Sequence, residues 1–377
     1  MDGCEVTIVA VDMYLVDLMP PVKRSDAIQS FTKQETVVLS ITDSTGLVGS
    51  GFTYSIGTAG RAVYAHLEHD LLDVLLGADP RNIEALWKTL YFKTHATTPG
   101  AVTASAMCAV DTALWDMRCK RAGVPLWRLA GGAKPCIDLY DTEGGWLHLS
   151  PGEVAANAAA SCERGIAGVK IKVGSPHVSD DVARLRAVRD ALSGSPRFDV
   201  MVDANQAWTV PEAIRRAKAY EPFGLAWLEE PLPADDVEGH ARLCASTTIP
   251  IAVGESLYTI GQFRDYLQRG ACSVVQPDVG RVGGITPWLK VAHMAEAFNI
   301  PVAPHYLMEI HAQLVCAVPN SMILEHFTPA FEAITTKSPI AIRDGKGYPS
   351  EDPGIGFAWD MDAIQRLAVL PVVHKAV

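Results

Sequence analysis

The chain has 377 residues, of which 49% are hydrophobic and 20% are charged, a balance typical of globular proteins. This length is too great for one small core and predicts two domains, one of which has room for a complete barrel. The formal net charge of −11 argues against nucleic acid as a partner, because a phosphate backbone demands a basic surface. An anionic ligand would therefore need a local cationic pocket or a metal ion.

Cysteine usage and the shortness of the apolar runs predict a soluble, cytoplasmic protein. The eight cysteines form no Cys-x-x-Cys pair and have no histidine at zinc spacing, so we expect reduced, buried thiols. Residues 1–5 (Met-Asp-Gly-Cys-Glu) lack the basic and apolar regions of a signal peptide. No apolar run approaches the roughly 18 residues that a membrane span requires.

Strands followed by helices predict an α+β domain over residues 1–130. Residues 6–15 and 35–54 alternate as strands do, and the second range turns at 43–46, Asp-Ser-Thr-Gly. The proline-stiffened basic loop 19–24 lies between them and is either a solvated connection or a flap over an anionic ligand. Helical periodicity then covers 62–76, 83–91 and 101–122.

From Cys136 onward, short apolar strands alternate with helical stretches such as 154–164, 182–192 and 211–220. The expected strands are 137–140, 169–173, 200–202, 225–228, 251–253, 273–276, 302–303 and 322–324. These repeated strand–helix steps match a closed parallel barrel over residues 131–345 better than an open, doubly wound sheet. Residues 346–377 have little periodicity and are expected to return to the first domain.

In a parallel barrel the working residues lie at the carboxyl ends of the strands. Lys170 and Lys172 project from the same side of one strand, and two buried ammonium groups need anionic partners. A half-exposed strand that leaves both lysines in water is the alternative. The strands that follow end in Asp203, Glu229, Glu255, Asp278, His305 and Glu325.

Asp203, Glu229 and Glu255 end three consecutive strands and cannot share a pocket without a cation. Oxygen ligands alone favour Mg²⁺, with Mn²⁺ as a possible substitute. The alternative is that each carboxylate caps the helix after it, which suits one strand end better than three in succession. Glu230 is predicted to point away from Glu229, because neighbouring residues of a strand face opposite sides.

Asp278 and His305 end two later strands, across the pocket from the lysines. A carboxylate beside an imidazole fixes its tautomer and stabilises the imidazolium, which is what a general acid–base needs. A hydrogen-bonded structural histidine is the alternative. Glu325, if protonated, would donate a hydrogen bond to a developing oxyanion. The sequence has no Gly-x-Ser-x-Gly motif, so it implies no serine nucleophile.

Together these residues resemble the mandelate racemase subgroup of the enolase superfamily, and the resemblance covers almost the whole chain. It implies an α/β fold in which an N-terminal α+β capping domain precedes a modified TIM barrel, (β/α)7β. It also implies one Mg²⁺ per subunit, held by Asp203, Glu229 and Glu255, which would chelate a substrate carboxylate. Members of this subgroup usually form symmetric assemblies, so a homo-oligomer is implied.

The resemblance also assigns roles around the metal. Lys172 would be a base on one face of the substrate's α-carbon, and His305, held by Asp278, would be the acid or base on the other face. Glu325 would contact a carboxylate oxygen. The residues that bind substrate would be Lys170 and Asn205.

Specificity would come from the capping loops 19–24 and 51–57. Lys23 and Arg24, in the first loop, leave open a second, distal carboxylate on the substrate. The segments most similar to acid-sugar dehydratases of the L-talarate/galactarate type are 144–148, 275–278, 281–285 and 303–311.

The implied reaction is dehydration of an aldonate or aldarate. Abstraction of the α-proton gives an enediolate, and loss of the β-hydroxyl then gives a 2-keto-3-deoxy acid. The partner would be this small carboxylate, with neither nucleic acid nor membrane. One alternative is a racemase or epimerase of a 2-hydroxy or sugar acid that uses the same two bases. A remote alternative is a non-catalytic binding protein that keeps the fold.

Overall fold

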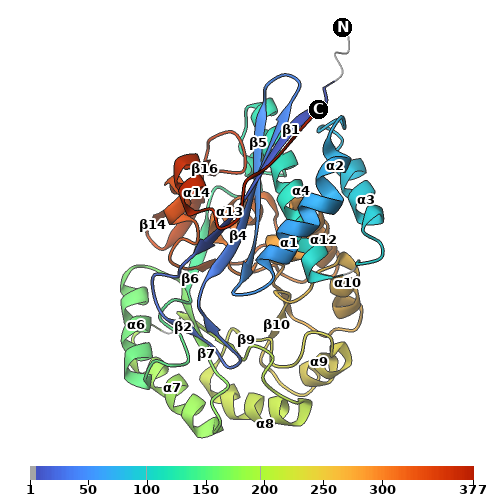
Figure 1. Cartoon of the computed structure of the whole chain (residues 1–377). Helices are drawn as coiled ribbons and strands as arrows, with labels where there is room; N and C mark the ends of the chain where they lie inside the picture. Colours follow the sequence, from blue (N-terminus) through green and yellow to red (C-terminus); the bar gives the residue numbers. More distant parts are fainter. Residues whose placement is uncertain (1–5, 99, 196) are drawn as a thin grey trace.

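The computed structural model describes residues 6–98, 100–195 and 197–377. An antiparallel sheet with its helices, the cap, lies above a ring of strands and helices (Figure 1). The predicted α/β fold, a modified TIM barrel with an N-terminal α+β cap, is confirmed. The limits expected for the domains stay a prediction.

The cap sheet has the strand order β17-β1-β4-β5. Its strands are β1 (Ile8–Leu18), β4 (Gln34–Asp43), β5 (Val48–Ile56) and β17 (Val373–Ala376). The turn between β4 and β5 is held by Asp43, whose Oδ1 accepts hydrogen bonds from the backbone N of Thr45 at 2.9 Å and of Leu47 at 3.1 Å. Because β17 pairs antiparallel with β1, the two ends of the described chain lie in one sheet (Figure 1).

The loop predicted at 19–24 leads into a small hairpin, β2 (Arg24–Ser25) and β3 (Ser30–Phe31), which reaches down from the cap toward the barrel (Figure 1). Its connection to the barrel is direct, because the backbone N of Leu147 donates to the carbonyl of Ser25 at 3.0 Å. The hairpin therefore touches the barrel mouth on one side, while residues 21–23 and 28–30 stay exposed.

The cap helices are α1 (Gly60–His66), α2 (Leu72–Leu75), α3 (Ile83–Lys93) and α4 (Ala101–Ala122). The single helix expected at 62–76 is interrupted by the π-helical turn η1 (Leu67–Leu71), so that prediction was too simple. The α4 bounds agree with the prediction. Gly51 lets α4 approach β5 closely, since a Cβ there would lie 2.1 Å from the carbonyl oxygen of Ala109.

The barrel strands are β6 (Ile137–Asp141), β7 (Gly168–Lys172), β8 (Asp199–Asp203), β9 (Trp227–Glu229), β10 (Ile251–Val253), β11 (Val274–Val275) and β12 (Leu324–His326). They pair in parallel in the order β11-β10-β9-β8-β7-β6, and β12 pairs with β6. The strand expected at 302–303 is wrong. Val302 instead makes isolated parallel bridges to Val275 and Ser321, which close the ring.

Proline explains this shortened strand. Pro301 and Pro304 flank the bridge, and neither residue has a backbone N–H to extend a ladder of hydrogen bonds. The neighbouring β12 also begins later than the expected 322, at Leu324. The barrel is therefore least regular on the side from which His305 enters the pocket.

An outer ring of helices surrounds the barrel (Figure 1). Its members are α6 (Pro151–Glu163), α7 (Val178–Ala191), α8 (Val210–Tyr220), α9 (Val237–Cys244), α10 (Ile260–Gln268), α12 (Ile285–Ala297) and α13 (Met308–Ala317). The shorter α5 (Leu126–Leu129) and α11 (Val279–Val282) complete the set before the C-terminal segment. Ser150 starts α6 with a capping box to Glu153, which satisfies two backbone donors.

The C-terminal segment packs on both lobes. It contains β13 (Thr335–Lys337), β14 (Ile340–Arg343), β15 (Lys346–Pro349), β16 (Ala358–Trp359) and α14 (Met361–Leu367). β15 pairs antiparallel with the barrel strand β6, and Ala368 bridges to Val16 of the cap strand β1.

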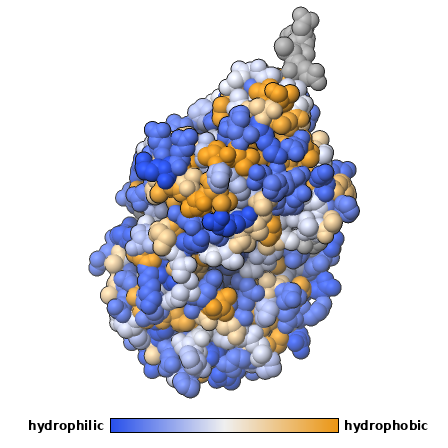
Figure 2. Space-filling model, viewed as in Figure 1, coloured by the Kyte–Doolittle hydropathy of each residue, from blue (hydrophilic) through white to orange (hydrophobic). Residues whose placement is uncertain are grey.

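Large side chains fill the inside of the barrel, where Tyr140, Met201 and Trp227 are fully buried. On the face shown in Figure 2, hydrophobic residues gather over the cap, and the barrel surface is mostly hydrophilic. None of the helices in the described ranges is both long and apolar enough to span a bilayer.

The seven described cysteines are all free thiols, and Cys4 lies outside the described residues. Four of them are buried, as expected, but Cys136, Cys162 and Cys244 are partly exposed. These three lie near the ends of barrel elements, where side chains reach solvent more easily than in the core.

Candidate active site

A cavity lies where the cap meets the carboxyl ends of the barrel strands. The cap lines it with residues of the 18–34 region and with Ile56. The barrel lines it with Lys170, Lys172, Asn205, Glu255, His305 and Glu325. Six of the residues predicted from the sequence therefore face one enclosed space.

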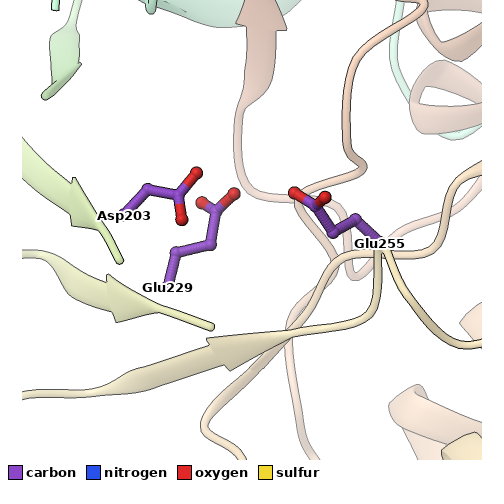
Figure 3. Close-up of side chains that lie close together, drawn as sticks. All are labelled: Asp203, Glu229 and Glu255. Carbon is purple, nitrogen blue, oxygen red and sulfur yellow. The ribbon is translucent and has the colours of Figure 1, made fainter. Parts of the chain in front are cut away.

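Asp203, Glu229 and Glu255 lie close together at the barrel end of this cavity, and Glu255 is the one of the three that lines it (Figure 3). Asp203 and Glu229 are the last residues of β8 and β9, and Glu255 follows β10 by two residues. Each offers a carboxylate oxygen, and these oxygens lie within 4.8 Å of one another. Three buried carboxylates at this separation repel, and their hard oxygen donors suit Mg²⁺, so this donor set fits a divalent cation.

Gly254 aims Glu255 at the other two carboxylates. Its φ of +150° lies in a region that favours glycine, and a Cβ there would lie within 2.7 Å of the backbone of Gln276. The chain can thus turn sharply between β10 and Glu255 while staying packed against the neighbouring strand end.

The two lysines of β7 each meet carboxylates. Lys170 Nζ lies 2.7 Å from Glu229 Oε1 and 2.5 Å from Glu325 Oε1, and Lys172 forms an ion pair with Asp203. Burial opposes both charges, but these carboxylates outweigh it and raise the pKa of each lysine. Both ammonium groups are therefore buried and paired, and the reading that leaves them in water is wrong.

Of the three carboxylates, only Glu229 has a raised pKa, whereas the pKa values of Asp203 and Glu255 are lowered. Burial raises the pKa of Glu229 to about 7, because the repulsion from Asp203 adds to desolvation and offsets the attraction of Lys170. Its oxygens are also fixed by neutral donors, since the Nε2 of Gln276 and the Nε1 of Trp227 lie 2.8 and 3.0 Å from Oε2.

His305 reaches the triad from the other side. Its Nδ1 lies 2.8 Å from Asp278 Oδ2, and its Nε2 lies 3.3 Å from Glu255 Oε2. Burial opposes the imidazolium, but the charges of Glu255 and Asp278 raise the pKa of His305. Burial alone would raise the pKa of Asp278, but its hydrogen bond to His305 and the charge of His305 lower that pKa to about 2.

Lys172 and His305 come from well-separated parts of the ring. Strand β7, which carries Lys172, is separated from the Val302 bridge by β6 and β12 in one direction and by β8 to β11 in the other. Lys172 contacts Asp203 and His305 contacts Glu255, so these two residues flank the triad at different carboxylates.

Glu325 accepts hydrogen bonds from Thr142 Oγ1 at 2.8 Å and from the backbone N of Tyr306 at 2.6 Å. Burial opposes its charge, but Lys170 outweighs it and lowers the pKa of Glu325. The group is thus a carboxylate here and must gain a proton before it can donate to an oxyanion. Asn205 lines the cavity, and its buried Oδ1 has no partner within the described ranges.

Glu230 lies outside the carboxylate cluster, as strand parity predicts. Its φ of +37° turns the chain, and its Oε2 accepts a hydrogen bond of 3.1 Å from Gln206 Nε2. Burial, with the nearby charges of Glu255 and Asp203, raises the pKa of Glu230 well above that of an ordinary glutamic acid.

Sequence reasoning missed four residues that shape the site. Tyr54 donates to Asp278, Arg281 lies 3.2 Å from Glu255, Trp146 packs its ring 5.4 Å from Lys172 Nζ, and Gln276 binds Glu229. For Gln276 a signal was present, because it directly follows β11, two residues before Asp278. No local pattern marked Tyr54, which belongs to the cap.

Models of two protein families match most of the chain. The model for the mandelate racemase/muconate lactonizing enzyme N-terminal domain matches residues 5–131. The enolase C-terminal domain-like model matches residues 153–363.

Individual relatives share both lobes. The L-talarate/galactarate dehydratase of Salmonella typhimurium is 40% identical over 329 residues, which span 86% of this chain and 81% of the relative. The 3,6-anhydro-α-L-galactonate cycloisomerase of Streptomyces coelicolor is 36% identical over 96% of this chain and 99% of the relative. A solved structure of the Salmonella dehydratase, liganded with Mg and L-lyxarohydroxamate, has a TM-score of 0.92 at 36% identity and covers 99% of this chain and 95% of that chain.

Proposed function

The chain belongs to the mandelate racemase/muconate lactonizing enzyme family of the enolase superfamily, and we propose that it is a Mg²⁺-dependent acid-sugar dehydratase. The substrate is an aldonate or aldarate of the galactarate/L-talarate type, and the product is a 2-keto-3-deoxy acid. The observation that carries this proposal is the buried carboxylate triad, flanked by Lys172 at Asp203 and by His305 at Glu255.

Asp203, Glu229 and Glu255 would hold one Mg²⁺, for which Mn²⁺ is a possible substitute. When bound, the ion supplies positive charge that stabilises an enediolate and disfavours the protonated form of Lys172. The role of the chain is to keep these donors buried and close together before the ion arrives.

Lys172 and His305 transfer the protons. One of them accepts the α-proton, and the C–H electron pair moves into the enediolate. The imidazolium of His305 then gives its Nε2 proton to the β-hydroxyl, which leaves as water as the C–O bond breaks. Asp278 supports both states of His305, because its 2.8 Å hydrogen bond fixes Nδ1 as the donor and leaves Nε2 for the substrate.

Neighbouring residues position the substrate. Lys170 Nζ offers a buried positive charge beside Glu325, at the place where a carboxylate oxygen would gain charge. Asn205 offers a side-chain amide with a vacant acceptor oxygen. Trp146, packed over Lys172, keeps water away from the base.

A racemase or epimerase is the second candidate. The observation that favours it is the placement of Lys172 and His305 at different carboxylates of the triad, since two bases on two faces allow reprotonation with inversion. In elimination the β-hydroxyl, rather than the α-carbon, receives the proton, and the C–O bond breaks with loss of water.

The partner is then a small sugar acid rather than nucleic acid or a membrane. The net charge of −11 supports this choice. We also propose a homo-oligomer, as is usual in this subgroup, and a cytoplasmic location, which the seven free thiols support.

The test is a screen of mono- and diacid sugars with Mg²⁺ in D₂O, followed by proton NMR. A 2-keto-3-deoxy product supports dehydration, whereas deuterium at the α-carbon with all hydroxyls retained supports epimerisation. The Lys172→Ala and His305→Ala proteins are the controls and should lose the keto-deoxy product. A screen without product or exchange would overturn both candidates.

A further inference from the structure

We infer that the substrate is a monocarboxylic sugar acid, whose end remote from the triad is an uncharged, hydroxyl-bearing carbon. This inference rests on the proposed function, because it assumes that the reacting carboxylate lies at the triad. It is carried by the part of the cavity that the cap contributes, which we call the roof. Its apolar residues are Leu18, Met19, Pro20, Pro21, Phe31 and Ile56, and its polar residues are Arg24, Gln29, Lys33 and Gln34.

The roof is mainly apolar and faces the barrel floor. A substrate held by its carboxylate at Asp203, Glu229 and Glu255 extends from the floor toward it. Phe327, from the loop after β12, adds another apolar side chain to the same wall. Met19 and Pro21 are exposed, whereas Leu18 is buried and Phe31 and Ile56 are half-buried. A second carboxylate against the inner part of this wall would lose hydration, which is costly unless a cation pairs with it.

Arg24 and Lys33 are the cationic side chains of the roof, and the charge of Arg24 is already paired. Lys23, beside Arg24, is exposed and is not among the residues that line the cavity. The Nε and Nη2 of Arg24 donate to the two oxygens of Glu143 at 2.9 and 2.7 Å, a bidentate pair. The guanidinium also lies over the ring of Phe327, 5.3 Å from its centroid.

Glu143 is itself fixed in place. Its oxygens accept hydrogen bonds from Trp146 Nε1 at 3.1 Å and from the backbone N of Thr328 at 3.0 Å. Arg24 therefore has a rigid partner, and a substrate carboxylate would have to displace a buried bidentate ion pair to reach it.

Lys33 is the other cation, and it lies between two carboxylates. Its Nζ is 2.7 Å from Asp17 Oδ2 and 3.0 Å from Glu35 Oε1. Glu35 is anchored in turn, because its Oε2 accepts from the backbone N of Gly60 at 3.0 Å. The lysine charge is thus more than neutralised before any substrate arrives.

The charges at the roof leave an excess of one negative charge. Arg24 and Lys33 supply two positive charges, and their partners supply three negative charges, on Glu143, Asp17 and Glu35. A terminal CH₂OH group meets this wall without repulsion and has the neutral amide of Gln29 as a hydrogen-bonding partner in the cavity lining. A terminal carboxylate is repelled.

The first test compares matched pairs of substrates that differ only at the remote carbon. Galactonate with galactarate and gluconate with glucarate are such pairs, and each is assayed with Mg²⁺ for keto-deoxy product. We expect kcat/KM for the monoacid to exceed that for the diacid at least tenfold in each pair that reacts. Preference for the diacid would overturn the inference and leave the dehydratase function standing. Absence of product from every pair would overturn both.

The second test changes the charge of the roof. In the double variant Asp17→Asn/Glu35→Gln, Lys33 keeps its hydrogen-bonding neighbours but is no longer neutralised. We expect the monoacid-to-diacid ratio of kcat/KM to fall at least tenfold. Adding Lys33→Met to this double variant is the matched control and should restore the original ratio. A ratio that stays the same in the double variant would contradict the assignment.

Discussion

The hydroxyl of Tyr54 donates a 2.5 Å hydrogen bond to Asp278 Oδ2, although the two residues belong to different lobes. The same oxygen accepts from His305 Nδ1 at 2.8 Å. Tyr54 lies on β5 of the cap, and Asp278 follows β11 of the barrel. The cap therefore helps to hold the Asp278–His305 pair, which we propose as the acid–base group, as well as lining the pocket.

Replacing Tyr54 by phenylalanine should lower kcat about tenfold or more, because a hydrogen bond to a charged group contributes about 1.5–3 kcal/mol. The pKa of His305 should also rise further, since Asp278 would keep more of its negative charge for the imidazolium. The pH profile of kcat measures this shift, and the limb that reports His305 should move to higher pH.

Tyr64→Phe is the matched control for that experiment. Tyr64 is also a buried cap tyrosine, and its hydroxyl donates to the carbonyl of Pro371 at 2.6 Å, away from the pocket. We expect its pH profile to superimpose on that of the wild type. If Tyr54→Phe and Tyr64→Phe behaved alike, the hydroxyl of Tyr54 would have no special part in catalysis.

The His305→Asn enzyme should separate the two proton transfers. Loss of the acid should reduce dehydration by about 10²–10⁴, while Lys172 still exchanges the α-proton of any substrate whose proton faces it. Proton NMR in D₂O measures both rates in one sample. In the Lys172→Ala enzyme, that exchange should disappear. Equal loss of both signals in His305→Asn would argue that the histidine is needed for the first step as well.

Mg²⁺ binding should depend on pH because of Glu229. Its pKa is raised to about 7 without metal, and the group must lose its proton to become a ligand. The apparent Kd should therefore weaken up to about tenfold per pH unit below pH 7 and level off above it. Calorimetric titration between pH 5.5 and 8 measures this dependence of the Kd on pH.

The Asp203→Asn variant should show no Mg²⁺-dependent rise in melting temperature, whereas the wild type should show one.

Asp111 should make stability depend on pH at the contact between α4 and α12. Its Oδ2 accepts from the backbone N of Thr286 at 2.9 Å, and burial raises its pKa to about 7. Because the folded pKa lies above the unfolded value, this group stabilises the fold at low pH, and the contribution is lost as pH rises from about 4 to 7.

The Asp111→Asn variant should not lose folding stability over this pH range. Relative to the variant, the wild type should become less stable across this window by up to about 4 kcal/mol and change little above pH 8. Urea unfolding at a series of pH values gives the comparison. Parallel stability curves for the two proteins would show that Asp111 stays ionised in the folded state.

The three carboxylates could be located from the sequence because Asp203 and Glu229 end apolar strands and Glu255 follows one by two residues. Asp203, Glu229 and Glu255 needed no knowledge of packing once the barrel periodicity was recognised, since parallel strands bring their carboxyl ends to one mouth. The same reasoning placed Lys172 and His305 on the wall of the cavity.

The contacts between the cap and the barrel could not be predicted in this way. Tyr54 and Asp278 are 224 residues apart, and Arg24 and Glu143 are 119 apart, so no local pattern records either contact. Arg24 seemed open to a distal carboxylate only because its partner lies in the other lobe. The broken strand at Val302 was missed for a local reason, since its flanking prolines carry an apolar pattern without the backbone donors.

The pairing of β17 with β1 has a consequence for synthesis. As the chain leaves the ribosome, β1 appears first among the strands and can pair with β4 early, but its second edge waits until the whole barrel has been translated. An unpaired edge of this kind attracts other chains, so the nascent protein is exposed to misassembly until its last strand arrives. The cap sheet is thus the last part of the fold to be completed, and chaperone contacts should concentrate on β1.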